Sequence, residues 1–200
     1  SAQIKGTTIK HPKSMQRSMA HEASIHSRHG SNWLRAGNME GSIYHFNIAH
    51  ELNPQSKIIS SNLALSHFNI AAQLNSKNSQ SAALFHYRSG LKFQPKNQAA
   101  RNNLAWILAT SPEEKIRNQK EALKMATQLN QETGSKIPQV LDTLATSQAA
   151  TGEFEIAVNT IKKAISFLKE KPDAKLLKSL QHRLNLYNNQ KTYIEKGSRD

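Results

Sequence analysis

The fold is decided by residues 145–164, ATSQAATGEFEIAVNTIKKA, where small residues stand at fixed distances from a glycine. Ala145 lies seven positions before Gly152, Ala157 and Ala164 lie five and twelve positions after it, and a bulky residue stands at nine. A small residue on each of two neighbouring helices lets their backbones approach closely, and glycine tolerates the dihedral angles of a tight loop between them. The stretch therefore predicts a helix hairpin.

The same spacing recurs twice earlier in the chain, with a turn residue, small residues five and twelve positions later and an aromatic residue between them: Gly37, Ser42, Phe46 and Ala49, then Asn78, Ala83, Tyr87 and Gly90. Recurrence of one helix pair is typical of an array in which each unit packs on its neighbours. The order of small, turn, small and aromatic residues resembles the tetratricopeptide repeat family. That resemblance implies an all-α fold, an α-α superhelix or solenoid of helix pairs.

The distance between units is irregular. Gly37 and Asn78 lie 41 residues apart, against about 34 in the tetratricopeptide repeat. The excess is nearly two helical turns, so a lengthened helix keeps its buried face aligned, and we expect one long helix over 57–75. In the third unit, Ser111 and Asn118 each precede a glutamate at the spacing of a capping box. We therefore expect a short turn at 111–118 and a helix at 118–131.

Four helix pairs and a capping helix account for most of the chain. We expect a repeat domain over 14–190, with units at about 14–56, 57–98, 99–134 and 135–172 and a C-terminal capping helix at 173–190. Leu176, Leu180 and Leu184 recur at helical spacing in that last segment, which would cover the apolar face of the final repeat. Residues 1–13 lack periodicity and are expected to form a flexible arm, and residues 191–200 a tail.

Composition excludes several classes of site. The 200 residues include no cysteine, so disulfides, thiolate metal sites and cysteine nucleophiles are excluded. No apolar run approaches the length of a membrane span.

The net charge of +13 favours anionic partners such as nucleic acid, acidic proteins, glycans or lipid head groups, although solubility alone would also account for it. Because the sequence begins with serine, we expect a processed product or part of a larger chain.

A closer resemblance covers residues 99–190. Four elements are similar to the tetratricopeptide tails of planctomycete-type and related bacterial envelope proteins: NNLAWILATSP at 102–112, EAL at 121–123, LDTLA at 141–145 and RLNLY at 183–187. The resemblance implies a bacterial, non-enzymatic module in or facing the envelope, and so favours an extracytoplasmic over a cytoplasmic location. It does not identify a partner.

In such arrays the first helix of each pair lines a groove for a peptide. The position two before each small contact residue faces that groove and holds Arg28, Asn62, Asn103 and Thr143. Asn62 and Asn103 resemble the asparagine ladder of O-GlcNAc transferase, whose amides bind a peptide backbone. Capping or solvation of the helix surface is the alternative for both.

Three further residues are candidates for the same groove. Trp106 lies about one turn after Asn103 and is either an aromatic anchor for a partner or part of the core. Arg28 and Arg35 would favour an acidic peptide or a C-terminal carboxylate, and the alternative for each is solvated surface charge.

The sequence contains no recognisable catalytic or cofactor-binding constellation. There is no nucleophile elbow, phosphate-binding glycine loop or convincing pair of carboxylates, so we do not expect an enzyme. His26 and His29 lie one turn apart, but no carboxylate completes a metal site, so packing is favoured and no metal or cofactor is expected. A basic edge comprises Lys162, Lys163, Lys169, Lys175 and Lys178. Its lack of interleaved aromatic residues argues against sequence-specific recognition of nucleic acid.

Two functions remain open. The favoured hypothesis is a non-catalytic scaffold that binds a peptide or partner subunit, an acidic one being favoured by the charge, in its groove or by docking onto a larger assembly. The alternative is a basic module for RNA, an acidic glycan or an anionic membrane surface. It predicts binding that weakens steeply with salt.

Overall fold

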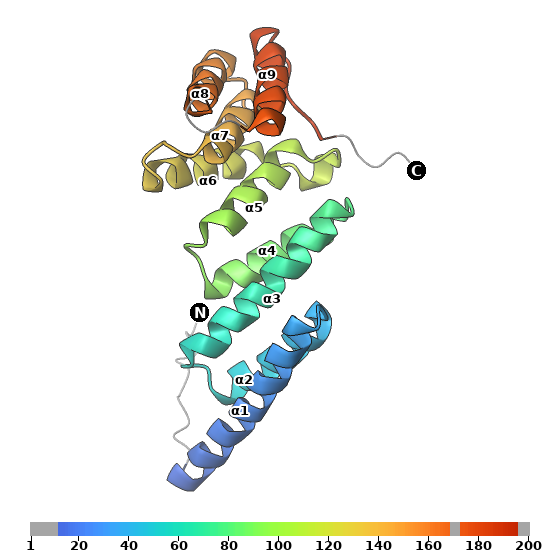
Figure 1. The fold of residues 1–200 in the computed structure, drawn as a ribbon, viewed down its shortest axis with the longest axis vertical. Helices are drawn as coiled ribbons and strands as arrows, with labels where there is room; N and C mark the ends of the chain where they lie inside the picture. The colour runs from blue at the N-terminus through green and yellow to red at the C-terminus, as the bar shows by residue number, and fades with distance from the viewer. Residues whose placement is uncertain (1–11, 169–172, 196–200) are drawn as a thin grey trace, which may run out of the picture. The chain divides into compact units, whose positions relative to one another are not determined.

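The computed structural model describes residues 12–168 and 173–195, and every regular element in these two ranges is a helix. Within them, nine α-helices and one 3-10 turn, η1, follow one another along the chain (Figure 1). The chain divides into two compact units, and the boundary between them, after His67, falls within α3.

The first unit contains α1 (Lys13–Arg35), α2 (Met39–Leu52) and the first part of α3 (Lys57–Ser76). Helices α1 and α2 form the predicted hairpin, and its turn residue Gly37 has φ of +78°, a conformation that glycine adopts without strain. A Cβ atom on Gly30 would lie 3.0 Å from the ring of Phe46. The absence of that atom therefore lets α1 and α2 approach closely, as the repeat pattern predicts. The core here includes Ala23, Ala49 and Ile59.

The second unit contains the rest of α3 and then α4 (Gln80–Phe93), α5 (Gln98–Thr110), η1 (Glu114–Ile116), α6 (Gln119–Glu132), α7 (Pro138–Ala150), α8 (Phe154–Phe167) and α9 (Ala174–Asn188). Helix α5 packs against α6, α7 against α8, and α9 against α8 (Figure 1). Two apolar clusters lie between these helices. One includes Tyr87, Leu104 and Leu108, and the other includes Leu141, Ile161 and Leu180.

Polar side chains cap the N-termini of three helices of the second unit. The side-chain oxygens of Asn97, Asn118 and Asp173 each accept a hydrogen bond from a backbone N–H three residues further on, at the starts of α5, α6 and α9. The Asn118 side-chain amide also donates to the Glu121 carboxylate at 3.0 Å, whereas its backbone N–H donates to the Leu108 carbonyl, so only the first half of the capping box expected here is formed.

The capping box expected at Ser111 is absent, and that prediction is wrong. Ser111 Oγ accepts instead from the backbone N–H of Glu113 at 3.2 Å. The reason lies at the other end of the segment, where the N–H of Asn118 donates to the Leu108 carbonyl of α5 at 2.9 Å. This bond returns the chain to the end of α5, and the segment between contains only the single turn of η1.

The predicted long helix at 57–75 is observed as α3, and the helix predicted at 118–131 is observed as α6. The all-α fold of helix pairs with a final helix is confirmed. The boundaries of the repeat domain and its units stay predictions. Most of the predicted N-terminal arm, residues 1–11, lies outside the described residues.

Candidate functional site

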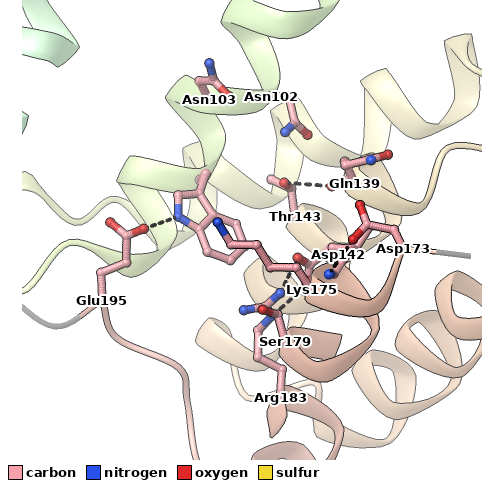
Figure 2. Close-up of a pocket in the computed structure, with 12 residues that line it drawn as sticks. Asn102, Asn103, Gln139, Asp142, Thr143, Asp173, Lys175, Ser179, Arg183 and Glu195 are labelled. Carbon is pink, nitrogen blue, oxygen red and sulfur yellow. Dashed lines mark hydrogen bonds and ion pairs between the residues drawn. The ribbon is translucent and has the colours of Figure 1, made fainter. Parts of the chain in front are cut away.

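A cleft of about 440 Å³ opens in the second unit between α5, α7 and α9. It is lined mainly by polar side chains of these helices and by one residue of the segment after α9 (Figure 2): Asn102, Asn103, Trp106, Gln139, Asp142, Thr143, Asp173, Lys175, Leu176, Ser179, Arg183 and Glu195. Figure 2 shows Glu195 at one side of the cleft and Gln139 and Asp173 at the other. Because α5 and α7 are the first helices of their pairs, the cleft lies where a repeat array is expected to hold a peptide.

A buried ion pair joins α7 to α9 beside this cleft. Asp142 accepts two hydrogen bonds from Arg183, at 2.7 Å from Nε and 2.5 Å from Nη2, and each residue is only 5% exposed. Burial raises the pKa of the Asp142 carboxyl, and the Arg183 cation opposes that change. One turn further along both helices, the Tyr187 hydroxyl donates to Thr146 Oγ1 at 2.9 Å. Two successive turns of α9 are therefore hydrogen-bonded to α7.

Trp106 lies half-buried at the edge of the cleft. Its indole Nε1 donates to the Glu195 carboxylate at 2.7 Å, and the Arg183 guanidinium lies 5.1 Å from the centre of its ring. The ring is thus neither enclosed in the core nor free in solvent. Both its polar edge and its face are engaged.

The amides of α5 lie beside the same cleft. Asn103 is exposed, and its Nδ2 donates to the hydroxyl of the buried Tyr87 at 3.0 Å. Burial raises the pKa of that hydroxyl, while the bond from Asn103 lowers it. Asn102 Oδ1 is buried and has no hydrogen-bond partner among the described residues. On α7, Thr143 Oγ1 donates to the Gln139 carbonyl at 3.1 Å.

The segment after α9 contributes contacts that the sequence did not predict. The backbone N–H of Glu195 donates to the Thr110 carbonyl at 2.8 Å, and its carboxylate accepts from Gln80 Nε2 at 2.8 Å as well as from Trp106. The ring of Tyr193 lies 5.8 Å from that of Trp106. Residues 191–195 have no periodicity and no motif, and the residues that bind Glu195 come from α4 and α5, far away in the sequence. No pattern could have indicated this contact.

The candidate groove residues divide between the two units. Asn103 and Trp106 line the cleft in the second unit, together with Thr143. Asn62, Arg28 and Arg35 belong to the first unit. There, Asn62 is half-buried, Arg28 is exposed beside a smaller cleft between α1 and the start of α3, and Arg35 donates to Asn32 Oδ1 at 2.9 Å. The role of each in binding stays a prediction.

The basic edge lies on two helices. Lys162 and Lys163 are exposed on α8, and Lys175 and Lys178 are exposed on α9, where Lys175 also lines the cleft. Lys169 lies outside the described residues. Binding of an anion by these lysines stays a prediction.

Three histidines meet between α1 and α2. His26 Nδ1 lies 3.0 Å from His45 Nδ1, and the ring of His29 stacks on that of His45 at 5.3 Å. Burial lowers the pKa of His45, and the neighbouring His26 and His29 lower it further. In the part of the chain that the structure describes, no group of three or more His, Asp or Glu side chains is arranged to hold a metal ion.

The arrangement of helix pairs defines a tetratricopeptide-like helical repeat protein. Solved structures with a similar fold include "MamA 41-end from Desulfovibrio magneticus RS-1" and the "MamA RS-1 ArsTM double mutant", each 15% identical with a TM-score of 0.56. The alignments cover 86% of this chain and 90% and 92% of those chains. No protein-family model matches the chain, and no curated protein does either. At this identity the similarity concerns the fold alone. Across the described residues, no helix combines the length and apolar character needed to cross a membrane.

Proposed function

We propose that this protein is a non-catalytic interaction scaffold that binds a peptide segment of a partner protein in the cleft between α5, α7 and α9. The observation that carries the proposal is the set of side chains that line the cleft, in which neutral amides and a hydroxyl of α5 and α7 lie around the half-buried Trp106. Amides supply both donors and acceptors, which suits the alternating N–H and C=O groups of a peptide backbone. A tryptophan at the edge offers a large contact area for a partner side chain.

The charged groups at the cleft support binding over catalysis. The Asp142 carboxylate is paired with Arg183 and only 5% exposed, so it is not free to move a proton to or from a ligand. Lys175 is exposed at the rim, where its charge would attract an acidic segment without holding it in a fixed geometry. The net charge of +13 favours the same class of partner at longer range.

The resemblance of residues 99–190 to tails of bacterial envelope proteins supports a scaffold in or facing the envelope, attached to a larger assembly. Fractionation of cells that express the tagged natural protein tests this part. Recovery with cytosolic markers alone would contradict it.

Selection of a displayed random peptide library on the full chain tests the binding proposal. Selected peptides should lose affinity for an Asn103→Ala/Trp106→Ala variant by about 10- to 100-fold, the loss expected when an anchor residue is removed. The matched control is Asn159→Ala, which removes an exposed amide from α8 outside the cleft. Circular dichroism establishes that each variant keeps its helices. Equal binding by the double variant and the wild type would refute the cleft as the binding site.

A further inference from the structure

The end of the described chain lies at one side of the cleft, where Glu195 makes the kind of contacts that a peptide ligand would make. After α9 ends at Asn188, residues 191–195 have no regular structure, and Glu195 reaches α4 and α5. We propose that this segment is an internal occupant of the binding site, and that the cleft selects partner segments with the same chemistry, an aromatic residue followed two positions later by an acidic one. This inference rests on the proposed function, because it specifies which peptide the cleft binds.

The carboxylate of the occupant is held by two neutral donors. Glu195 Oε1 accepts from Trp106 Nε1 at 2.7 Å, and Oε2 accepts from Gln80 Nε2 at 2.8 Å. Gln80 is 3% exposed, and both bonds are of the short, charge-assisted kind. A neutral amide in place of the carboxylate would offer one acceptor oxygen to two donors. The site therefore distinguishes an acidic side chain from its amide.

The backbone of the same residue completes the contact. The N–H of Glu195 donates to the carbonyl of Thr110, the last residue of α5, at 2.8 Å. A carbonyl at the end of a helix has no partner within that helix, and Thr110 is buried, so it needs a donor from elsewhere. The cleft thus offers one acceptor and two donors to a single residue that carries an N–H and a carboxylate.

An aromatic ring two residues earlier is held by a cation. The Arg183 guanidinium lies 5.1 Å from the centre of the Tyr193 ring and 5.1 Å from that of Trp106. The His182 and Tyr193 rings also lie nearly perpendicular to each other, with their centres 6.3 Å apart. Arg183 keeps its orientation because Asp142 holds it by two bonds. An incoming aromatic residue can therefore replace Tyr193 on a surface that is already ordered.

One polar atom of the site remains for a partner. Gln80 Oε1 is buried and has no hydrogen-bond partner among the residues that the structure describes, although the amide nitrogen of the same side chain binds Glu195. A buried acceptor without a donor is unfavourable. A longer peptide that adds an N–H at this point would gain a bond that the internal segment does not make, which gives a partner an advantage over the occupant.

Competition between the internal segment and a free peptide tests the inference. The probe is a fluorescein-labelled peptide of sequence QKTYIEKG, corresponding to residues 190–197. Its binding is measured by anisotropy with the full wild-type chain and with a full-length Tyr193→Ala/Glu195→Gln chain, whose own segment is weakened. The second chain should bind the probe at least about tenfold more tightly, because less of its cleft is occupied.

Three controls define the chemistry of that binding. In the weakened chain, Trp106→Phe keeps a ring and removes the indole donor, and it should reduce affinity about 10- to 100-fold, the effect of one hydrogen bond to a charged group. A probe with glutamine in place of its glutamate should lose a similar factor. Asn159→Ala, on the exposed surface of α8, should change nothing.

The emission of Trp106 gives a second measurement that does not depend on the probe. The sequence has two tryptophans, so Trp33→Phe leaves Trp106 as the only reporter. In that background, Glu195→Gln should shift its emission, and excess unlabelled peptide should reverse the shift.

The inference is overturned if the two chains bind the probe equally, or if Trp106→Phe leaves binding unchanged. Peptides selected from the random library provide the distinction from the proposed function. If they bind through Asn103 and Trp106 but the probe does not displace them, the cleft is a peptide site with another specificity, and only this inference fails.

Discussion

The ion pair between Asp142 and Arg183 allows a quantitative test of how the cleft is held together. Asp142→Asn keeps the shape of the side chain and removes its charge, leaving the Arg183 cation 5% exposed without a counter-charge. Arginine does not lose its proton at accessible pH, so the buried charge cannot be relieved by titration. Removing one partner of a buried pair destabilises a protein by about 3–5 kcal/mol. We expect a loss of that size at neutral pH, and a smaller one in acid, where the raised pKa of Asp142 brings the wild-type carboxyl closer to neutralisation.

Arg183→Met should behave differently. Burial already raises the pKa of Asp142, and removing the opposing cation raises it further. A carboxyl whose pKa is higher in the folded than in the unfolded state contributes stability that is lost as pH rises through the folded value. The free energy of unfolding of this variant should therefore increase as pH falls below neutral. It also loses the contacts of the guanidinium with Trp106 and Tyr193, worth about 0.5–1 kcal/mol each.

The assay is urea unfolding followed by the emission of Trp106 in a Trp33→Phe background, because Trp106 lies in the same unit as the pair. Trp106 then reports the unfolding of the second unit, so the unfolding of the two units is not analysed as a single transition. The double variant Asp142→Asn/Arg183→Met should lose about 1–3 kcal/mol less than the sum of the single losses. Strict additivity, or a loss below about 1 kcal/mol for Asp142→Asn, would refute the argument that the pair is buried and coupled.

Three further predictions concern the helix pairs. Gly90→Ala should destabilise the second unit in urea by about 1–3 kcal/mol, since the new Cβ would lie 2.4 Å from the ring of Phe68; an unchanged midpoint would mean that the ring moves aside freely. Gly152→Ala should lower the free energy of unfolding by about 1–2 kcal/mol, because its φ is +87° although the space around it is open. The first unit should lose stability as pH falls below 6.5, since the pKa of His45 is lowered in the fold and the unfolded chain then binds more protons. Emission of Trp33 in a chain with no other tryptophan measures this loss, and His45→Asn should flatten it.

The repeat fold was predictable because its signal is local and repeated. Gly30 faces Phe46, and Gly90 approaches Phe68 so closely that a single methyl group would collide. Such contacts need small residues at fixed distances from a turn, and that pattern is visible in the sequence alone. Gly37, Asn78 and Gly152, the turn residues of the three recurring patterns, all have positive φ angles.

The capping box predicted at Ser111 is absent because a contact between distant parts of the loop, and not a local pattern, determines the structure there. Ser111 and Glu114 have the right spacing, but the bond from Asn118 to the Leu108 carbonyl determines the path of that segment. A tertiary hydrogen bond of this kind joins two ends of a loop that must already be close together. Local propensity contains no information about it, so the sequence pattern predicted a cap that the fold replaces with a different contact.

The candidate site was predictable only in part for the same reason. Asn103 and Trp106 could be proposed because they lie about one turn apart on the same face of a predicted helix. The hydrogen bond between Gln80 and Glu195 could not, because these residues are 115 positions apart in the sequence. The geometry of that contact also narrows the ligand. A small carboxylic acid would satisfy Trp106 and Gln80 and leave the Thr110 carbonyl without the N–H that it now receives. Only a ligand that brings a backbone N–H together with its carboxylate replaces all three bonds, and that combination is the property of an acidic residue within a peptide.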